Sequence, residues 1–361
     1  MSLAAGARRQ RGSSLVGNES RIAWLLMIPA FLVMAAVAIY PLGQVVGLSF
    51  TDARFATQND DRQFVGIDNY RQLLSMTIRE LPPIIDPATG QQEIRNGQPR
   101  FESWVRVLPR EPLRYIEAYQ FSLFGKRYVL GAVSPAFIKA AVDTVRFAVS
   151  SVFLETLLGM VVALILVTEF FGRGVLRTAM LLPWSIVTVV AARIWEWMLQ
   201  PTRVGLFNTL LSDLGLGSGS IAFFQTEALQ LPTMIAMDVW KTTPFMALLF
   251  MAGLSMIPKE LYEAAEIDGA GPIRRFFSIT LPLMTPTIAV ALVFRTLDSL
   301  RVFDVFQVVL GGQRYSLASY THSLLIDQRS VGMSSAASVL IFGLILVFAI
   351  SYMRMLKVDT K

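Results

Sequence analysis

Six long apolar stretches dominate this chain of 361 residues and decide what it can fold into. A helix of about 20 mostly apolar residues crosses a bilayer, because its backbone polar groups bond to one another. Stretches of this length lie at about residues 22–48, 137–168, 175–199, 229–256, 284–309 and 335–356. Only 16% of the residues are charged, against about 25% in soluble domains. The sequence therefore predicts an all-α integral membrane protein with six transmembrane helices.

The composition excludes several classes of function. The chain has no cysteine for disulfides, thiolate catalysis or metal binding, and a single histidine, His322, makes no cluster for zinc. We therefore expect no metal site and no catalytic residue. The net charge is +6, but the basic residues are scattered and form no aromatic–basic module. We expect no nucleic acid as a partner, because excess Lys and Arg in a membrane protein more often reports topology.

Positive charge predicts how the six spans are oriented. Arg and Lys gather in the N-terminal tail, in the loop at 169–177, in the segment 257–283 and at the C-terminal end. The segment around 200–228, by contrast, carries only Arg203 among basic residues. Because cytoplasmic loops carry the excess of Lys and Arg, the N and C termini and the segment 258–282 are predicted to be cytoplasmic.

The segment 49–136 is then predicted to lie outside the cell membrane, since loops longer than about 60 residues are translocated largely regardless of charge. Asp86-Pro87 and Asn96-Gly97 are turn signals on either side of a short apolar run. They predict a small extracytoplasmic α+β insertion between helices 1 and 2. The predicted division is a cytoplasmic tail (1–21), the first helix (22–48), the insertion (49–136), a core transmembrane domain (137–356) and a second tail (357–361).

The segment 258–282 is polar and carries start and stop signals for two short helices. Pro258 suits a first helical turn, and Gly269 suits the left-handed residue that closes a helix. Pro272 opens a second helix, which Pro282 is expected to end. Each would span about ten residues and would be unstable alone in water. Such a pair between membrane spans is best explained as a docking element that another protein completes.

The same segment resembles the EAA loop of permease subunits in bacterial ATP-binding-cassette importers. The likeness lies in Glu263-Ala264-Ala265, then three residues, Gly269, nine residues and Ile279-x-Leu281-Pro282. The alternative interpretation of this segment is an ordinary cytoplasmic helix-turn-helix connector. The resemblance implies that the following residues couple the chain to an ATPase: Glu263, Ala264, Ala265, Asp268, Gly269, Ile279, Leu281 and Pro282.

Three further strings, at 173–184, 238–245 and 294–304, resemble permeases of the carbohydrate-uptake branch typified by maltose and trehalose importers. The trehalose-type subunits look more similar in Trp240-Lys241-Thr242-Thr243-Pro244-Phe245 than the maltose-type ones. Where this family often has Gly-Gly-Gly-Pro, the chain has Gly311-Gly312-Gln313-Arg314, so a difference is expected at the outer end of the fifth helix.

The resemblance implies a multi-pass subunit of a bacterial inner membrane importer with a trehalose-like di- or oligosaccharide as substrate. Its implied partners are a second permease subunit in a heterodimer, two copies of an ATPase subunit, an extracytoplasmic solute-binding protein and membrane lipid. The chain has no Gly-x-x-x-x-Gly-Lys-Ser/Thr string, so ATP and Mg are expected on the partner subunits, with no cofactor in this chain. The insertion is then either a platform for the binding protein or a stabilising cap over the spans.

Charged residues inside the predicted fifth span suggest a transport pathway. Arg295, Asp298, Arg301 and Asp304 lie three apart, and ionisable groups at membrane depth are costly unless they pair or face water. The spacing allows Asp298 to pair with either arginine. We expect Arg295 and Asp304 to be structural. The resemblance implies that the sugar is lined by Lys241, Thr242, Phe245, Leu297, Asp298 and Arg301; the alternative is that these charges and the Pro244 kink only hold the bundle together.

Two other functions stay open from the sequence. An ion- or proton-coupled secondary transporter could use Asp298 and Asp304 as carriers, but it leaves the pattern at 258–282 unexplained. A membrane-embedded enzyme is the second alternative. The chain has no Cys and no His-Glu-x-x-His string, so it offers few residues that could catalyse a reaction.

Overall fold

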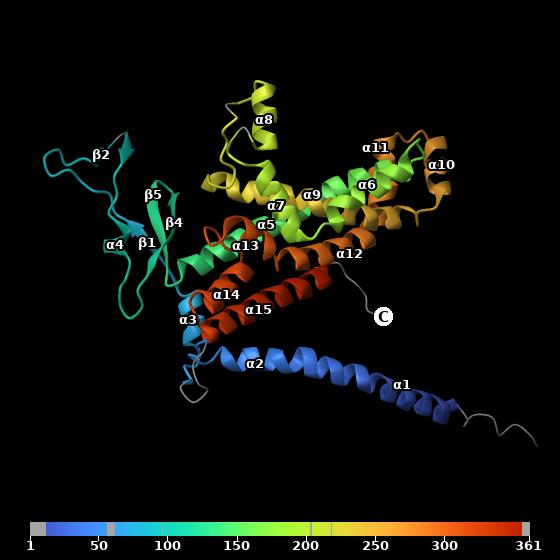
Figure 1. Cartoon of the computed structure of the whole chain (residues 1–361), viewed down its shortest axis with the longest axis horizontal. Coiled ribbons are helices and arrows are strands. Elements are labelled where there is room, and N and C mark those ends of the chain that lie inside the picture. The colour runs from blue at the N-terminus through green and yellow to red at the C-terminus, as the bar shows by residue number, and fades with distance from the viewer. Residues whose placement is uncertain (1–11, 56–61, 96, 203, 218, 356–361) are drawn as a thin grey trace, which may run out of the picture.

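The protein is described by a computed structural model over residues 12–55, 62–95, 97–202, 204–217 and 219–355. The C-terminal tail at 357–361 and most of the N-terminal tail at 1–21 lie outside these residues. Long helices run side by side along the longest axis (Figure 1). A β-rich segment lies at one end of this bundle, and two short helices, α10 (Lys259–Ile267) and α11 (Pro272–Arg275), lie at the other.

Five helices of the described chain are long and apolar enough to cross a membrane, and a bent pair brings the number to as many as six. The five apolar spans are Ile22–Leu48, Pro135–Val167, Glu227–Leu254, Pro272–Ser299 and Val331–Tyr352. They belong to α1 (Gly12–Met34) with α2 (Tyr40–Leu48), α5 (Pro135–Val167), α9 (Glu227–Leu254), α11 with α12 (Leu281–Ser299), and α15 (Val331–Met355). Each overlaps an apolar stretch of the sequence.

The predicted third span at 175–199 is not one helix. It is broken into α6 (Arg173–Ser185) and α7 (Thr188–Met198), which are bent by 95°. Ile186 and Val187 adopt extended backbone between the two, shortly after Pro183. The apolar composition predicts how long such a stretch is. Whether the stretch forms one continuous helix depends on these backbone angles.

The predicted fifth span at 284–309 is wrong at its C-terminal end. α12 stops at Ser299, and a separate α13 (Asp304–Leu310) follows after a break. The segment 258–282 also differs from the prediction, because Pro282 does not end a helix. A π-helical turn at Phe276–Thr280 joins α11 to α12 and precedes this proline, which occupies the first turn of α12.

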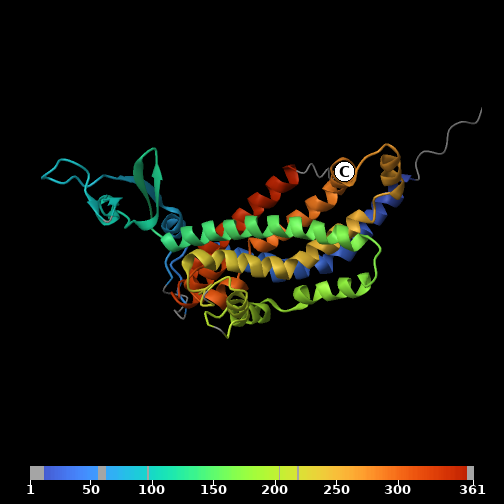
Figure 2. The ribbon, with the colours of Figure 1, turned by 90° about the horizontal axis from the view of Figure 1, so that it is seen from above.

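Small residues allow the central helices to approach closely (Figure 2). A Cβ on Gly159 of α5 would lie 2.7 Å from Cβ of Met246 on α9, and one on Gly253 would lie 2.6 Å from Oγ1 of Thr287 on α12. Phe250 and Met284 are buried in the apolar core beside these contacts. This packing agrees with membrane helix interfaces, where small side chains permit close van der Waals contact.

The end of α2 and the start of α15 meet at the end of the bundle that carries the strands. α2 packs against α15, whereas the apolar window of the first span has no buried residue. The backbone N–H of Gly332, in the first turn of α15, donates to the carbonyl of Ala53 at 2.9 Å. A Cβ on Gly332 would lie 1.9 Å from the carbonyl oxygen of Thr51, so only glycine fits here.

Residues 68–132 contain two short helices, α3 (Asp68–Leu74) and α4 (Trp104–Val107), and two antiparallel sheets. The three-stranded sheet has the order β1 (Met76–Leu81), β5 (Lys126–Ala132), β4 (Ile116–Leu123), with Met76 opposite Ala132. The two-stranded sheet pairs β2 (Ile94–Arg95) with β3 (Gln98–Pro99). Leu81, Leu108 and Val129 form a small apolar core.

The connections between the late helices are also ordered. α8 (Leu206–Asp213) follows α7, and α14 (Leu317–Ile326) precedes α15. Between α13 and α14, Arg314 makes a bidentate ion pair with Asp143 of α5, at 2.6 and 2.7 Å. Arg314 belongs to the string that departs from the family's Gly-Gly-Gly-Pro. Its ion pair therefore links the connection between α13 and α14 to α5.

The close approach of α5 and α9 gives a first prediction. We expect Gly159→Ala to destabilise the protein by about 1–3 kcal/mol, because the added methyl overpacks the contact with Met246. Gly343→Ala is the matched control, since a Cβ at Gly343 of α15 meets nothing within 4 Å. Thermal unfolding of the purified protein in detergent measures both. Equal losses in the two variants would contradict this account of the helix contact.

Candidate functional site

A polar cavity of about 170 Å³ lies where α9, the end of α12 and the break before α13 meet. Phe147 of α5 and Thr188 of α7 complete its walls. Its ionisable lining residues are Asp238, Lys241, Arg295, Asp298, Arg301 and Asp304. Such a concentration of charge within a bundle of apolar helices marks a functional site by default, since each group is costly at membrane depth.

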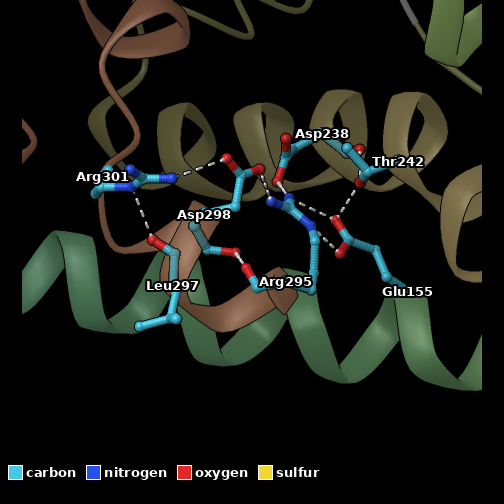
Figure 3. A network of polar contacts seen from close by, with 8 residues as sticks. Glu155, Asp238, Thr242, Arg295, Leu297, Asp298 and Arg301 are labelled. Carbon is cyan, nitrogen blue, oxygen red and sulfur yellow. Dashed lines mark hydrogen bonds and ion pairs between the residues drawn. The ribbon is translucent and has the colours of Figure 1, made fainter. Parts of the chain in front are cut away.

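Arg295 is the centre of the polar network behind this cavity (Figure 3). Its side chain is only 4% exposed. Nε and Nη2 donate to the two carboxylate oxygens of Glu155 on α5, at 2.5 and 2.9 Å. Nη2 also donates to Asp238 on α9, and Nη1 donates to Asp298 Oδ2 at 2.8 Å. One guanidinium therefore joins three helices through three carboxylates, using the forked geometry that favours arginine over lysine.

Thr242 completes the buried side of the network. Its hydroxyl lies 2.5 Å from Glu155 Oε1 and 2.6 Å from the backbone carbonyl of Asp238, one turn earlier on α9. A hydroxyl has one proton to donate, so it satisfies one of these acceptors at a time. Glu155 is fully buried, and Arg295 and Thr242 are the partners that compensate its carboxylate.

Asp298 and Arg301 form the open side of the cavity. Both side chains are 66% exposed, and Arg301 Nη2 lies 4.0 Å from Asp298 Oδ1. Arg301 Nε also donates to the backbone carbonyl of Leu297 at 3.2 Å. Because Arg295 holds only one oxygen of Asp298 closely, the other remains available as an acceptor at the cavity.

The structure brings most, but not all, of the predicted sugar-lining residues together. Lys241, Thr242, Asp298 and Arg301 line the cavity. Phe245 is not among the lining residues and instead stacks on Trp184 of α6, with ring centroids 5.9 Å apart. Leu297 also lies outside the lining and joins the network through its carbonyl. These roles in binding stay predictions.

Asp298 lies near both arginines with which its pairing was expected, 2.8 Å from Arg295 and 4.0 Å from Arg301. Arg295 is buried and bonded to three carboxylates, and its expected structural role stays a prediction. Asp304, at the start of α13, lines the cavity and, like Lys241, makes no ion pair with any described residue. The sequence reasoning missed Glu155 and Asp238. Both are acidic residues within predicted spans, so the cost of charge at membrane depth could have found them too.

The predicted ATPase-coupling residues lie at the other functional candidate, the exposed helices α10 and α11. α10 ends in a Schellman motif: Ala270 N–H donates to the Ala265 carbonyl at 2.8 Å, and Gly269 has φ = +77°. Glu263 and Asp268 are exposed and make no ion pair within the described chain. Tyr262 and Thr280 hydroxyls lie 2.9 Å apart and fix α10 against the start of α12.

The sequence of residues 155–357 matches the family described as binding-protein-dependent transport system inner membrane component. The chain belongs to this family. It is a multi-pass inner membrane component of a transport system, as its apolar helices require. Within the described residues, no group of three or more His, Cys, Asp or Glu side chains is arranged to hold a metal ion.

Two similar proteins show how far the likeness extends. The trehalose/maltose transport system permease protein MalF of Thermococcus litoralis is 47% identical over 223 residues, covering 58% of this chain and 72% of that protein. The trehalose transport system permease protein SugA of Mycobacterium tuberculosis is 32% identical over 339 residues, covering 93% and 89%. The second likeness therefore includes the segment between the first two apolar spans.

Solved structures share the fold. A crystal structure of a bacterial ABC transporter involved in the import of the acidic polysaccharide alginate has a chain with a TM-score of 0.68 at 20% identity, covering 96% of this chain and 100% of that one. An alginate ABC transporter in complex with its pentasaccharide-bound periplasmic protein gives a TM-score of 0.57 at 26% identity, over 61% and 78%. The helical arrangement is thus that of an ABC importer subunit.

The network around Arg295 gives a second prediction. We expect Arg295→Gln to cost about 3–5 kcal/mol of stability, because it leaves the buried carboxylates of Glu155 and Asp238 without their cation. Arg301→Gln is the control: Arg301 is exposed, and a change of no more than about 0.5 kcal/mol is expected. Thermal unfolding in detergent compares the two. Similar stability of both variants would show that the buried network does not hold the helices together.

Proposed function

We propose that the chain is the permease subunit of a sugar importer driven by ATP that is hydrolysed in a separate subunit. The observation that carries this proposal is the exposed pair α10–α11, a charged helical projection in a member of a transport family. It offers Glu263 and Asp268 to a partner, while the contact between Tyr262 and Thr280 links α10 to the start of α12, whose other end reaches the cavity.

The proposed topology has six spans, with the broken pair α6–α7 as the third, and both termini in the cytoplasm. The distribution of Lys and Arg supports this orientation. The start of α1 lies at the same end of the molecule as α10 and α11, and the β-rich segment lies at the opposite end (Figures 1 and 2). The proposed division is then a tail (1–21), a first helix (22–48), an extracytoplasmic insertion (49–136), a core domain (137–356) and a second tail (357–361).

The proposed cargo is a di- or oligosaccharide. The relatives named above as trehalose, maltose and alginate transport proteins support a carbohydrate. The cavity supplies the chemistry: Lys241 and Arg301 donate hydrogen bonds, Asp298 accepts them, and a polyhydroxylated ligand needs both. Phe245 and Leu297 remain candidates for contacts with the sugar in another conformation of the pathway.

The proposed assembly contains a second permease subunit, two copies of an ATPase that bind ATP and Mg, and an extracytoplasmic solute-binding protein. In this arrangement, closure of the ATPase pair moves α10 and α11 and thereby switches the spans between inward- and outward-facing states. The device is a two-state rigid-body change, which each ligand biases through its preference for one state.

Isolation of the complex from native membranes tests the proposal directly. We expect an ATPase and a second permease to co-purify with the tagged chain, and sugar uptake by the reconstituted complex to require ATP. The chain alone should transport nothing. Uptake by the chain alone that uncouplers abolish would instead favour a secondary transporter that uses Asp298 and Asp304.

The coupling role of α10 gives a further prediction. Gly269→Pro should fail to couple, because proline requires φ near −65° where Gly269 has +77°. Glu263→Arg reverses an exposed charge on the face offered to the ATPase. We expect both variants to insert into the membrane but to lose ATP-dependent uptake at least about tenfold, a loss of about 1.4 kcal/mol in coupling.

The control for these variants is Asp213→Arg, the same kind of charge reversal on the exposed surface of α8, away from α10 (Figure 1). ATP hydrolysis and sugar uptake are measured together in proteoliposomes. Wild-type uptake in both Gly269→Pro and Glu263→Arg would refute the docking role.

A further inference from the structure

We propose that Glu155 and Asp238 are specificity-determining residues, which close the cavity to anionic saccharides by occupying the Nε and Nη2 donors of Arg295. They act through Arg295 and are positioning residues for the transport site. The inference rests on the proposed function, because it concerns which sugars that same cavity accepts. Neither residue was expected to have a role from the sequence.

Without its carboxylate partners, Arg295 would bind anions. A guanidinium at the wall of a cavity is the side chain best suited to bind a carboxylate or phosphate in a bidentate manner. Arg295 lines the cavity, so an unpaired Arg295 would make it a receptor for anions. Instead, Glu155 accepts from its Nε and Nη2, Asp238 also accepts from Nη2, and Asp298 accepts one hydrogen bond from Nη1.

The ionisable groups in and behind the cavity sum to a net negative charge. The cavity and the buried layer behind it hold four carboxylates, of Glu155, Asp238, Asp298 and Asp304, against three cations, of Lys241, Arg295 and Arg301. With all groups ionised, the net charge is −1. Lys241 and Arg301 carry no surplus positive charge into the cavity, because Asp298 and Asp304 lie on the same walls.

This net charge affects anionic and neutral saccharides differently. An anionic saccharide leaves water to enter a site that already has one negative charge in excess, and Coulomb repulsion grows as the effective dielectric constant falls. Its charge also loses hydration without gaining a free guanidinium. A neutral saccharide suffers neither cost, and its hydroxyls can donate to the free oxygen of Asp298 and accept from Lys241. The cavity therefore favours neutral saccharides.

The experiment measures equilibrium binding to the complete detergent-solubilised complex with its partner permease and ATPase, without the solute-binding protein. The probes are trehalose, maltose and sucrose, each paired with its own 6-phosphate. We expect the wild-type complex to prefer the neutral sugar by at least about tenfold. Glu155→Gln keeps the shape and removes one carboxylate charge, so it should lower this preference at least about tenfold.

Two controls separate specificity from structure. Glu155→Asp keeps the charge and should keep the preference for the neutral sugar. Asp143→Asn removes a buried carboxylate from the bidentate pair with Arg314, outside the cavity, and should leave the preference unchanged. A merely structural role of Glu155 would change both affinities together and would leave their ratio as in the wild type.

Asp238→Asn is the second test variant, because it removes the charge of the other carboxylate bonded to Arg295 Nη2 while keeping the shape of the side chain. It should also lower the preference for the neutral sugar, and it decides the matter should Glu155→Gln fail to fold. A wild-type complex that binds both members of a pair equally, or variants with an unchanged ratio, would overturn this inference while leaving the sugar importer intact. Failure of the wild type to bind any neutral disaccharide would overturn the proposed function and this inference together.

Discussion

The bonding of one buried guanidinium to three carboxylates is the interaction on which the central part of this protein depends. Arg295 joins α12 to Glu155 on α5 and to Asp238 on α9, and all three residues are buried. Removal of one member of such a network leaves the charge of another member buried and uncompensated. Loss of any one member therefore destabilises the whole network. The network therefore fixes the relative positions of three helices without filling the space beside them.

The breaks in the helices become understandable beside this network. α12 stops at Ser299, one residue after Asp298, and the irregular backbone before α13 borders the polar cavity. Unpaired backbone groups at membrane depth are tolerated only where they are covered by protein or line a cavity. The bend between α6 and α7 brings Thr188 to the same cavity. Thus these two breaks occur where the bundle is polar rather than apolar.

The sequence was sufficient for the helical class and for the positions of the apolar spans, because length and apolarity determine both. It also located the two short helices α10 and α11, since Pro258, Gly269 and Pro272 have backbone requirements that allow few alternatives. It failed to predict where helices break, bend or continue. The break after Ser299, the passage of the helix through Pro282 and the bend at Ile186 arise from local backbone angles that no periodicity reports.

The candidate site shows the same division. Lys241, Thr242, Asp298 and Arg301 were found because they lie in strings that resemble a known family, and they share one cavity. Glu155 was overlooked because it is a single charge in an otherwise apolar stretch, more than 100 positions from its partner in the chain. Only the packing of α5 against α12 and α9 brings it to Arg295.

The contact between α2 and α15 constrains the order in which the bundle assembles. α2 precedes α15 in the chain and is translated earlier, yet α2 packs against α15, and Gly332 in the first turn of α15 bonds to Ala53. The docking of α2 on α15 therefore follows the synthesis of all the helices between them. A polypeptide truncated before α15 lacks the surface against which α2 packs.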